Sequence, residues 1–215
     1  MKIGSCEFPE DLLYDGENLV WSKASGGDFY VGATSPLVWL SGEIRRVQFR
    51  PVGSRVDVGQ LVASLDGVRN FTVVRSPVKG VVSEVNTTVN SDPFLLNRKP
   101  YGVWLCRLKD SLAPGNLKPL SEANEQIAQK LEELKVECHF AFPVSTLYEL
   151  GSECSAALSK LGDELNRVKK GDAVLLVTDE PTADIEIRRW SAQTGHKIVE
   201  RTKKGSVFEF LVEKS

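Results

Sequence analysis

The chain has 215 residues, 41% of them hydrophobic, so it can bury one large core or two small ones. Its 27 basic and 29 acidic residues give a formal net charge of -2, which argues against nucleic acid or a membrane surface as the partner. No apolar run approaches the roughly 20 residues of a membrane-spanning helix, and the first ten residues are too polar for a secretory signal. We therefore expect a soluble, cytoplasmic protein of two domains.

Short apolar stretches separated by glycine and proline turns predict an all-β first half. The predicted strands cover residues 19–22, 29–33, 42–49, 60–65, 71–75, 80–86 and 102–108. Turn sequences such as Asp15-Gly16 and Gly26-Gly27 lie between them. Many short strands at this spacing are typical of a barrel or a sandwich.

A link at about residues 111–120, which contains proline and glycine, precedes a predicted helix. Ile127, Leu131 and Leu134 recur at i, i+4 and i+7, which places them on one face of that helix. We expect this face to pack on the β domain, so that the helix completes a first domain of residues 1–137.

Residues 138–215 alternate between helical and extended patterns, which predicts a second, small α/β domain. An extended stretch runs to Leu150. The other predicted elements are helices at 154–168 and 183–193 and strands at 173–178, 197–201 and 207–212. The spacing of Leu158, Leu161 and Leu165 marks the buried face of the first helix.

Four groups of residues in the first half carry a resemblance to a known family. They are Tyr30-Val31-Gly32-Ala33-Thr34; Leu40-Ser41-Gly42-Glu43-Ile44; Ser76-Pro77-Val78-Lys79-Gly80 with Val85-Asn86; and Pro93-Phe94-Leu95-Leu96-Asn97 with Pro100-Tyr101-Gly102. In order and spacing they resemble the H-protein of the glycine cleavage system over roughly residues 12 to 110. The resemblance implies a lipoyl-type barrel of two sheets, with a hairpin lysine that carries a lipoyl arm between enzyme partners.

The position that the resemblance assigns to the lipoyl-lysine is occupied by Arg69, in the segment Asp66-Gly67-Val68-Arg69. Lipoylation needs an amine that can lose a proton, whereas a guanidinium stays protonated. We therefore expect Arg69 to be unmodified and the protein to hold no lipoyl cofactor. The nearest lysine, Lys79, lies beyond the hairpin, whose turn we predict at Asp66-Gly67.

Two interpretations of Arg69 remain open. The side chain can be a solvated arginine on an exposed turn. Alternatively, it provides a fixed positive charge that binds a carboxylate, a phosphate or a thiolate, while the barrel still docks its protein partners.

Five groups of residues in the second half resemble the TusA-like sulfur-carrier family over nearly all of residues 145 to 215. They are Leu150-Gly151-Ser152-Glu153-Cys154; Gly171-Asp172-Ala173; Asp179-Glu180-Pro181; Glu186-Ile187 with Trp190; and Thr194-Gly195-His196-Lys197-Ile198. The resemblance implies a two-layer sandwich of two helices on a four-stranded sheet, and a cysteine before the first helix that carries sulfur as a persulfide. That residue is Cys154, although the family's Cys-Pro-x-Pro is Cys154-Ser155-Ala156-Ala157 here.

A thiol at a helix N-terminus faces unpaired N–H groups and the positive end of the helix dipole, so we expect a lowered pKa for Cys154. The alternative is an inert small residue at a helix start. Cys6, Cys106 and Cys138 are expected to be free thiols, with Cys6 on a mobile N-terminus and Cys106 and Cys138 in strands. With only His139 and His196 as imidazoles, we expect no metal site.

Three functional hypotheses follow. In the first, the chain is an adaptor in sulfur or lipoate metabolism and both halves dock proteins. In the second, Cys154 relays sulfur as a persulfide between a donor and an acceptor protein. In the third, the chain is a glycine-cleavage carrier with a displaced attachment site. The sequence has no Ser/His/Asp arrangement and no phosphate-binding loop, so we expect no enzymatic turnover beyond a sulfurtransferase-type relay.

Overall fold

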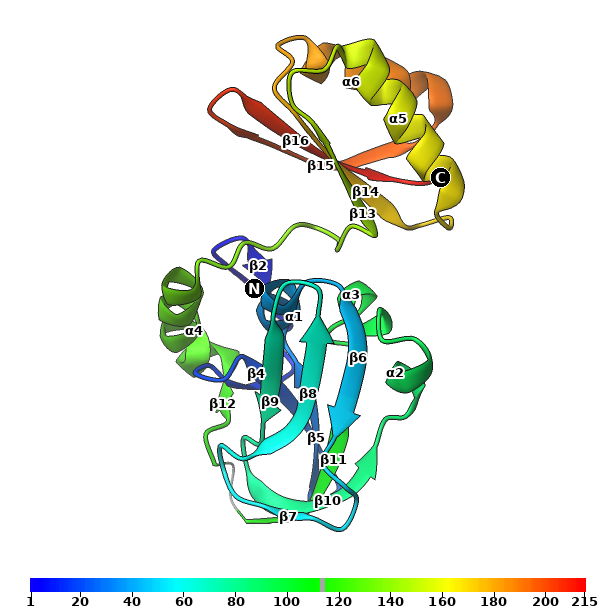
Figure 1. Cartoon of the computed structure of the whole chain (residues 1–215). Coiled ribbons are helices and arrows are strands. Elements are labelled where there is room, and N and C mark those ends of the chain that lie inside the picture. The colour runs from blue at the N-terminus through cyan, green and yellow to red at the C-terminus, as the bar shows by residue number, and fades with distance from the viewer. Residues whose placement is uncertain (113–114) are drawn as a thin grey trace. The chain divides into compact units, whose positions relative to one another are not determined.

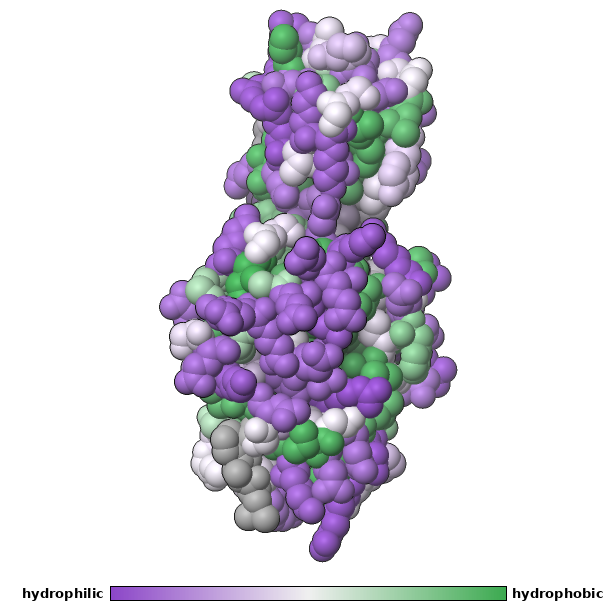
Figure 2. Space-filling view, turned by 90° about the vertical axis from the view of Figure 1, so that its left-hand side faces the viewer, coloured by the Kyte–Doolittle hydropathy of each residue, from purple (hydrophilic) through white to green (hydrophobic). Residues whose placement is uncertain are grey.

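The computed structural model describes residues 1–112 and 115–215, which divide into the units Met1–Cys138 and His139–Ser215 (Figure 1). Ala113 and Pro114, which belong to the predicted link, lie outside the described residues. None of the described helices has the length and apolar character needed to span a bilayer. The face of the molecule in Figure 2 is largely hydrophilic, with hydrophobic side chains in small separate groups.

The first unit is built on two larger sheets and a short N-terminal hairpin. The seven-stranded sheet has the order β12-β3-β4-β5-β11-β10-β7, and the three-stranded sheet has the order β6-β8-β9. Their strands are β3 (Leu13–Asp15), β4 (Val20–Ser25), β5 (Asp28–Ala33), β6 (Ile44–Phe49), β7 (Arg55–Val56), β8 (Leu61–Gly67), β9 (Phe71–Arg75), β10 (Lys79–Val85), β11 (Cys106–Leu112) and β12 (Lys118–Pro119). Val31 of β5, Leu65 of β8 and Leu108 of β11 are fully buried, so both sheets contribute to the core and the predicted β-sandwich is confirmed.

The first unit also holds helices. They are α1 (Ser35–Ser41), the single turns α2 (Thr88–Ser91) and α3 (Leu95–Arg98), and α4 (Leu120–Leu134). We did not predict α1, although Pro36 at its start and Gly42 directly after its end are the residues that favour helix termini. Gly42 has φ = 82°, a left-handed conformation that glycine adopts without strain.

Helix α4 packs on the β domain through the predicted face. Ile127 and Leu131 are buried and Leu134 is half-buried. The helix crosses Gly16, where an added Cβ would lie 3.2 Å from the Ile127 side chain. The prediction for this helix is therefore confirmed, and it belongs to the first unit.

The N-terminus is not mobile. The short strands β1 (Lys2–Ile3) and β2 (Cys6–Glu7) form a hairpin, and Cys6 and Phe8 are almost completely buried. The expectation of a mobile segment was wrong because these apolar side chains belong to the core of the first unit.

The second unit is a two-layer α/β sandwich. Its elements are β13 (Ser145–Glu149), α5 (Cys154–Arg167), β14 (Ala173–Thr178), α6 (Ala183–Thr194), β15 (Lys197–Lys204) and β16 (Val207–Glu213). The sheet order is β13-β14-β16-β15, with β13 and β14 parallel and the other pairs antiparallel.

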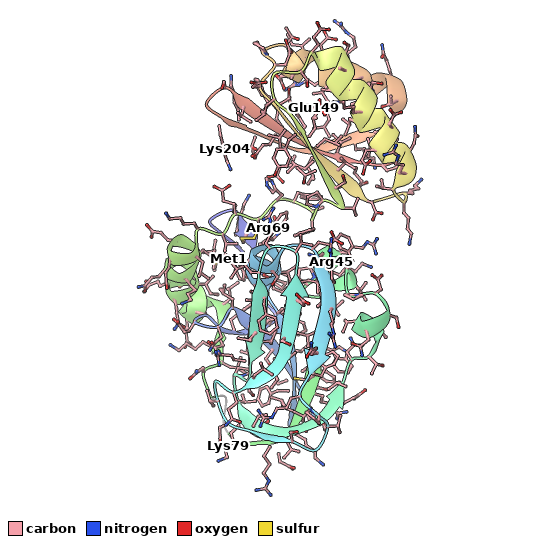
Figure 3. The ribbon with its side chains drawn as sticks, in the orientation of Figure 1. Met1, Arg45, Arg69, Lys79, Glu149 and Lys204 are labelled. Carbon is pink, nitrogen blue, oxygen red and sulfur yellow. A yellow bond between two sulfur atoms is a disulfide. The ribbon has the colours of Figure 1, made fainter. Side chains whose placement is uncertain are left out.

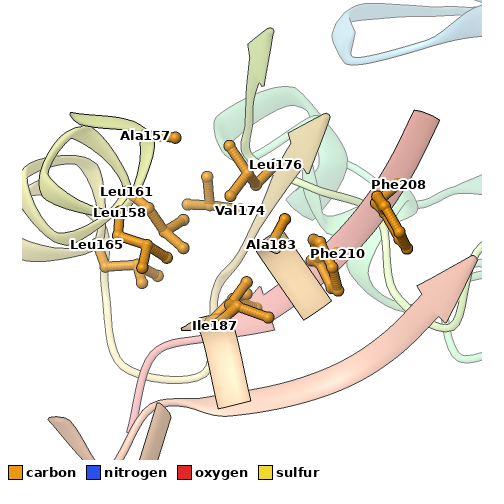
Figure 4. Close-up of a cluster of buried hydrophobic side chains, with 11 residues drawn as sticks. Ala157, Leu158, Leu161, Leu165, Val174, Leu176, Ala183, Ile187, Phe208 and Phe210 are labelled. Atoms are coloured by element: carbon orange, nitrogen blue, oxygen red, sulfur yellow. The ribbon is translucent and has the colours of Figure 1, made fainter. Parts of the chain in front are cut away.

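One core holds the two helices on this sheet (Figure 4). Leu158, Leu161 and Leu165 of α5 lie in it, as their spacing predicted. Ile187 of α6 and Phe210 of β16 pack in the same cluster. The predicted arrangement of two helices on a four-stranded sheet is confirmed.

Candidate functional site

Arg69 lies at the tip of the β8–β9 hairpin, but the turn is not where we predicted it. Asp66 and Gly67 still belong to β8, with Asp66 paired to Phe71 of β9, so the turn consists of residues 68–70. Gly67 is required for a different reason: an added Cβ would lie 2.1 Å from the Ser41 carbonyl oxygen. The glycine permits a close approach to α1 instead of forming the turn.

The hairpin tip is fixed to the C-terminal end of α1. The backbone N–H groups of Arg69 and Asn70 donate to the Ser41 carbonyl oxygen at 3.0 and 3.2 Å. The Asn70 side-chain amide donates to the Leu40 carbonyl oxygen at 2.7 Å. These carbonyls would otherwise lack partners at the helix end, so the tip supplies the donors that α1 needs.

The Arg69 side chain is exposed, and its methylene stem crosses Gly42. Among the described residues, no carboxylate forms an ion pair with its guanidinium. Val68 and Phe71 beside it are 54% and 63% exposed. The tip therefore offers a positive charge between two apolar side chains, and an arginine there does not fit an amide-linked lipoyl group.

Lys79 is not an alternative attachment site on the same hairpin. Figure 3 shows Arg69 and Lys79 at opposite ends of the first unit. The Lys79 ammonium pairs with Asp57 at 3.1 Å, at the start of β10.

Cys154 is the first residue of α5 and is half-buried. It follows the loop of residues 150–153, which leaves the carboxyl end of β13. The neighbouring loop of residues 179–182 leaves the carboxyl end of the parallel strand β14, and the Gly151 N–H donates to Asp179 Oδ1 at 2.7 Å. Two loops from adjacent parallel strands thus meet at the N-terminus of α5.

Glu149, at the end of β13, holds the loop before Cys154 in place. Its side chain is buried and accepts hydrogen bonds from Ser152 Oγ and Lys160 Nζ, both at 2.8 Å. The Lys160 ammonium and the Ser152 hydroxyl lower the pKa of the Glu149 carboxyl from its ordinary value. Sequence reasoning missed this residue, although an acidic side chain shortly before the candidate cysteine was the available signal.

The environment of Cys154 does not favour the thiolate. Burial raises the pKa of the Cys154 thiol, and the carboxylates of Glu180 and Glu186 raise it further. Our prediction of a lowered pKa was wrong because α6 and the loop before it place these two acidic residues near the thiol, against the effect of the helix N-terminus. Spacing along the sequence gives no indication of this proximity.

Two of the four cysteines form a disulfide, so the expectation of free thiols was wrong for them. Cys6 and Cys138 are joined across 132 residues, with their Cα atoms 5.0 Å apart. Cys138 lies after α4 and not in a strand, and its N–H donates to Ser5 Oγ at 2.8 Å. The N-terminal hairpin and the segment after α4 are neighbours only in the folded first unit.

Cys106 is free, but it is fully buried in β11, and burial raises its pKa to about 12. Cys154 is therefore the one cysteine of the four that is both free and partly accessible.

The two histidines form no metal site in the part of the chain that the structure describes, where no group of three His, Cys, Asp or Glu side chains could hold an ion. His139 lies 3.3 Å from Glu200. His196 follows the C-cap Gly195 of α6, and its carbonyl oxygen accepts a hydrogen bond from Ser191 Oγ at 2.6 Å.

Comparison with protein families gives one match for each half of the chain. Residues 12–134 match the model described as Glycine cleavage H-protein, and residues 148–214 match the model described as Sulfurtransferase TusA.

Relatives and solved structures agree with the first of these matches. A probable glycine cleavage system H protein 2 of Saccharolobus solfataricus is 37% identical over 134 residues, which cover 60% of this chain and 89% of that protein. A probable glycine cleavage system H protein 3 of Sulfurisphaera tokodaii is 32% identical over 123 residues, 57% of this chain and 90% of that protein. The crystal structure of a glycine cleavage system H protein from Mycobacterium marinum aligns with a TM-score of 0.50 and 30% identity, over 55% of this chain and 98% of that one.

Proposed function

Because the chain belongs to the glycine cleavage H-protein family and continues into a TusA-type domain, we propose that it is a two-part carrier in sulfur trafficking. In this proposal Cys154 carries sulfur as a persulfide, and the H-type domain docks a protein partner. The observation that supports it is the state of the four cysteines, since Cys154 alone is both free and partly accessible.

The proposed transfer is a sulfur exchange that needs no oxidant. The Cys154 thiolate attacks the terminal sulfur of a persulfide on a donor protein, and the donor's S–S bond breaks. The donor leaves as a thiolate and takes up the proton that Cys154 lost. Cys154 is then a persulfide, and the reverse exchange passes the terminal sulfur to an acceptor thiol.

The acidic neighbours of Cys154 give the donor a role in this step. Burial and the carboxylates of Glu180 and Glu186 raise the pKa of the thiol, which disfavours the thiolate in the free protein. A donor with basic residues around its own cysteine would neutralise these carboxylates on docking and favour the thiolate. We propose that such a donor, and not a small-molecule persulfide, loads Cys154.

The H-type domain contributes docking in this proposal and does not carry a lipoyl group. Arg69 takes the position that the family resemblance assigns to the lipoyl-lysine, and it cannot form the amide. The exposed tip of Val68, Arg69 and Phe71 is suited to hold a partner through apolar contact and one fixed charge. We place this exchange in the cytoplasm, where donor thiols are kept reduced. The Cys6–Cys138 disulfide can persist there because both cysteines are almost completely buried and thus shielded from reductants.

A second function, an adaptor without sulfur chemistry, is favoured by one observation. The raised pKa of Cys154 is the opposite of what a reactive carrier thiol needs in isolation. In that case both domains only dock proteins.

Intact-mass measurement on protein from its natural source, with and without reductant, tests the carrier function. We expect a reductant-sensitive gain of one sulfur atom, which peptide mapping places on Cys154. The recombinant chain should gain the same sulfur from a persulfide donor, Cys154→Ser should not, and Cys106→Ser is the matched control that should still load. No loading by any donor would overturn the carrier function and leave the adaptor, and a lipoyl adduct on either protein would overturn the assignment for Arg69.

A further inference from the structure

A cavity on the outer face of the seven-stranded sheet has no part in the proposed sulfur chemistry. It has a volume of about 490 Å³, which lies within the range of roughly 300 to 1,000 Å³ that is typical of ligand pockets. It is lined by Trp21 of β4 and Tyr30 of β5, by Pro9 of the N-terminal segment, and by Tyr101 and Trp104 before β11. The chain has four tryptophans and four tyrosines, and half of each line this cavity.

The aromatic walls are held in place by their neighbours. Trp21 lies across Gly32 of the adjacent strand, where an added Cβ would come within 2.3 Å of the indole ring. The Trp21 Nε1–H donates to the Pro100 carbonyl oxygen at 3.0 Å, which links β4 to the segment before β11. The rings of Tyr30 and Trp104 meet edge to face at 5.3 Å. A ligand would therefore enter a site whose side chains are already ordered, which lowers the entropy cost of binding.

The Pro9 side of the cavity is fixed as well. The Tyr14 hydroxyl donates to the Pro9 carbonyl oxygen at 2.6 Å, and Phe8 next to it packs against Tyr101 with ring centroids 6.1 Å apart. Both walls are thus anchored in the core of the first unit.

The charges around the cavity restrict what it can bind. Asp11 and Lys23 are exposed at its rim and offset each other, so an anion such as phosphate would meet no cluster of cations. The Arg107 guanidinium lies over the ring of Tyr30, 5.5 Å from its centroid. It forms an ion pair with the Asp28 carboxylate at 2.7 Å. This guanidinium already occupies a face of the Tyr30 ring, so that face is not available to a quaternary ammonium ligand and an aromatic cage for cations is a poor fit.

The remaining class of ligand is neutral, apolar and able to lie flat against aromatic faces. We propose that this cavity binds a proline-rich segment of a partner protein in the polyproline II conformation. Proline rings pack on tryptophan and tyrosine faces, and the preformed extended helix loses little entropy on binding. Asp11 and Lys23 then pair with basic and acidic residues that flank the prolines and set the direction of the segment.

A fluorescence titration of the full chain tests this inference. The probe is a blocked ten-proline peptide, and the reference is a peptide of the same length made of alternating glycine and serine. We expect the proline peptide to bind below about 1 mM, the range of weak specific recognition, and to change the indole emission. The glycine-serine peptide should not bind.

Variants separate recognition by the cavity from non-specific adhesion. Trp104→Ala should weaken binding of the proline peptide by about tenfold or more, the loss expected for an aromatic residue at the centre of an interface. Tyr148→Ala removes an aromatic side chain that is 69% exposed in the second unit and should bind as the wild type does. Circular dichroism and thermal unfolding confirm that each variant is folded.

A charge reversal keeps the test decisive if Trp104→Ala fails to fold. Asp11 is exposed, so Asp11→Lys should fold, and it should weaken binding of a proline peptide with an added terminal arginine more than that of one with an added aspartate. Equal effects on both peptides, no binding of the proline peptide at 1 mM, or equal binding of the glycine-serine peptide would each overturn the inference. Sulfur loading of Cys154 should be the same in all these variants, so failure here is distinct from failure of the carrier proposal.

Discussion

The hairpin tip with Arg69 and the helix start with Cys154 are built in similar ways but differ in what limits their chemistry. Each follows the end of a strand, and each is fixed by hydrogen bonds to a neighbouring element, through Ser41 in one case and Asp179 in the other. At the hairpin the residue itself prevents acylation, because no environment makes a guanidinium a useful nucleophile. At the helix the residue is suitable, and its surroundings suppress the thiolate.

This difference shows that a site can keep its supporting geometry while its reactivity is changed, either by the residue itself or by the residues around it. The chemistry of the hairpin tip should return only when Arg69 itself is replaced. The chemistry of the helix start should increase when its neighbours are replaced and Cys154 is left alone. Five experiments test these expectations and the structural support of the two sites.

The largest effect is expected for Arg69→Lys. An amine at the hairpin tip restores the group that forms the amide, so a lipoate-protein ligase with lipoate and ATP should add one lipoyl group, whereas the wild type should gain none. Intact mass and peptide mapping follow the reaction, and Lys79→Arg in the same background confirms the position. A ligase that modifies a genuine H-protein but leaves Arg69→Lys unmodified would show that more than the residue has been lost from the tip.

Removal of the disulfide should destabilise the first unit and leave the reactivity of Cys154 in the second unit unchanged. Replacing Cys6 and Cys138 by serine should lower the free energy of unfolding of that unit by about 2 to 5 kcal/mol, because the bond closes a loop of 132 residues. Denaturant unfolding measures the loss. Alkylation of Cys154 in the folded protein should not change, and a change would mean that the disulfide supports the helix site as well.

Counting thiols checks the same bond in the wild type. The unfolded, unreduced chain should react at its two free cysteines, and the unfolded, reduced chain at all four. Four reactive thiols without reductant would contradict the disulfide.

A moderate effect is expected when the acidic neighbours of Cys154 are neutralised. Glu180 and Glu186 raise the pKa of the thiol, so Glu180→Gln with Glu186→Gln should lower it and shift the pH dependence of alkylation to lower pH. A fall of one pKa unit gives about tenfold faster reaction with iodoacetamide at neutral pH. Glu164→Gln, which lies in α5 like Cys154, is the matched control. An unchanged profile in the double variant would mean that burial alone suppresses the thiolate.

The smallest effect is expected for Lys160→Ala. The pKa of Glu149 is lowered in the folded state, so its ion pair adds stability above the ordinary pKa of 4.5, and this stability is lost as the pH falls through the folded pKa. Because the Lys160 side chain is 57% exposed, we expect a loss of about 1 kcal/mol or less at pH 7.

Measurement at pH 3 completes this comparison. There the difference from the wild type should shrink as Glu149 becomes protonated, whereas Lys170→Ala should change neither value. A loss that persists unchanged at low pH would indicate packing by the lysine stem in place of the ion pair.

Local patterns were sufficient to predict most of the fold. The spacing of Leu158, Leu161 and Leu165 gave the buried face of α5, and the spacing of Ile127 and Leu131 gave that of α4, because helix periodicity is a property of the segment alone. The longer strands of both units were also located, although β11 begins later than we predicted, at Cys106, and the short strands β1, β2, β3, β7 and β12 were missed.

The features that we missed depend on contacts between distant segments. Asp66-Gly67 has the composition of a turn, but its glycine is needed for the approach to Ser41. Cys6 and Cys138 meet only after the hairpin and α4 have folded. The pKa of Cys154 depends on carboxylates brought close by α6, so the residue could be identified from the sequence whereas its reactivity could not.

The separation of the two disulfide cysteines has a consequence for synthesis of the chain. Cys6 is translated 132 residues before Cys138, a delay of roughly 7 to 26 s at about 5 to 20 residues per second. Cys106 is translated within that interval and is the first thiol with which Cys6 can pair wrongly. Pairing of β11 with β5 and β10 buries Cys106, so formation of this sheet before Cys138 is translated would keep Cys6 available for its proper partner.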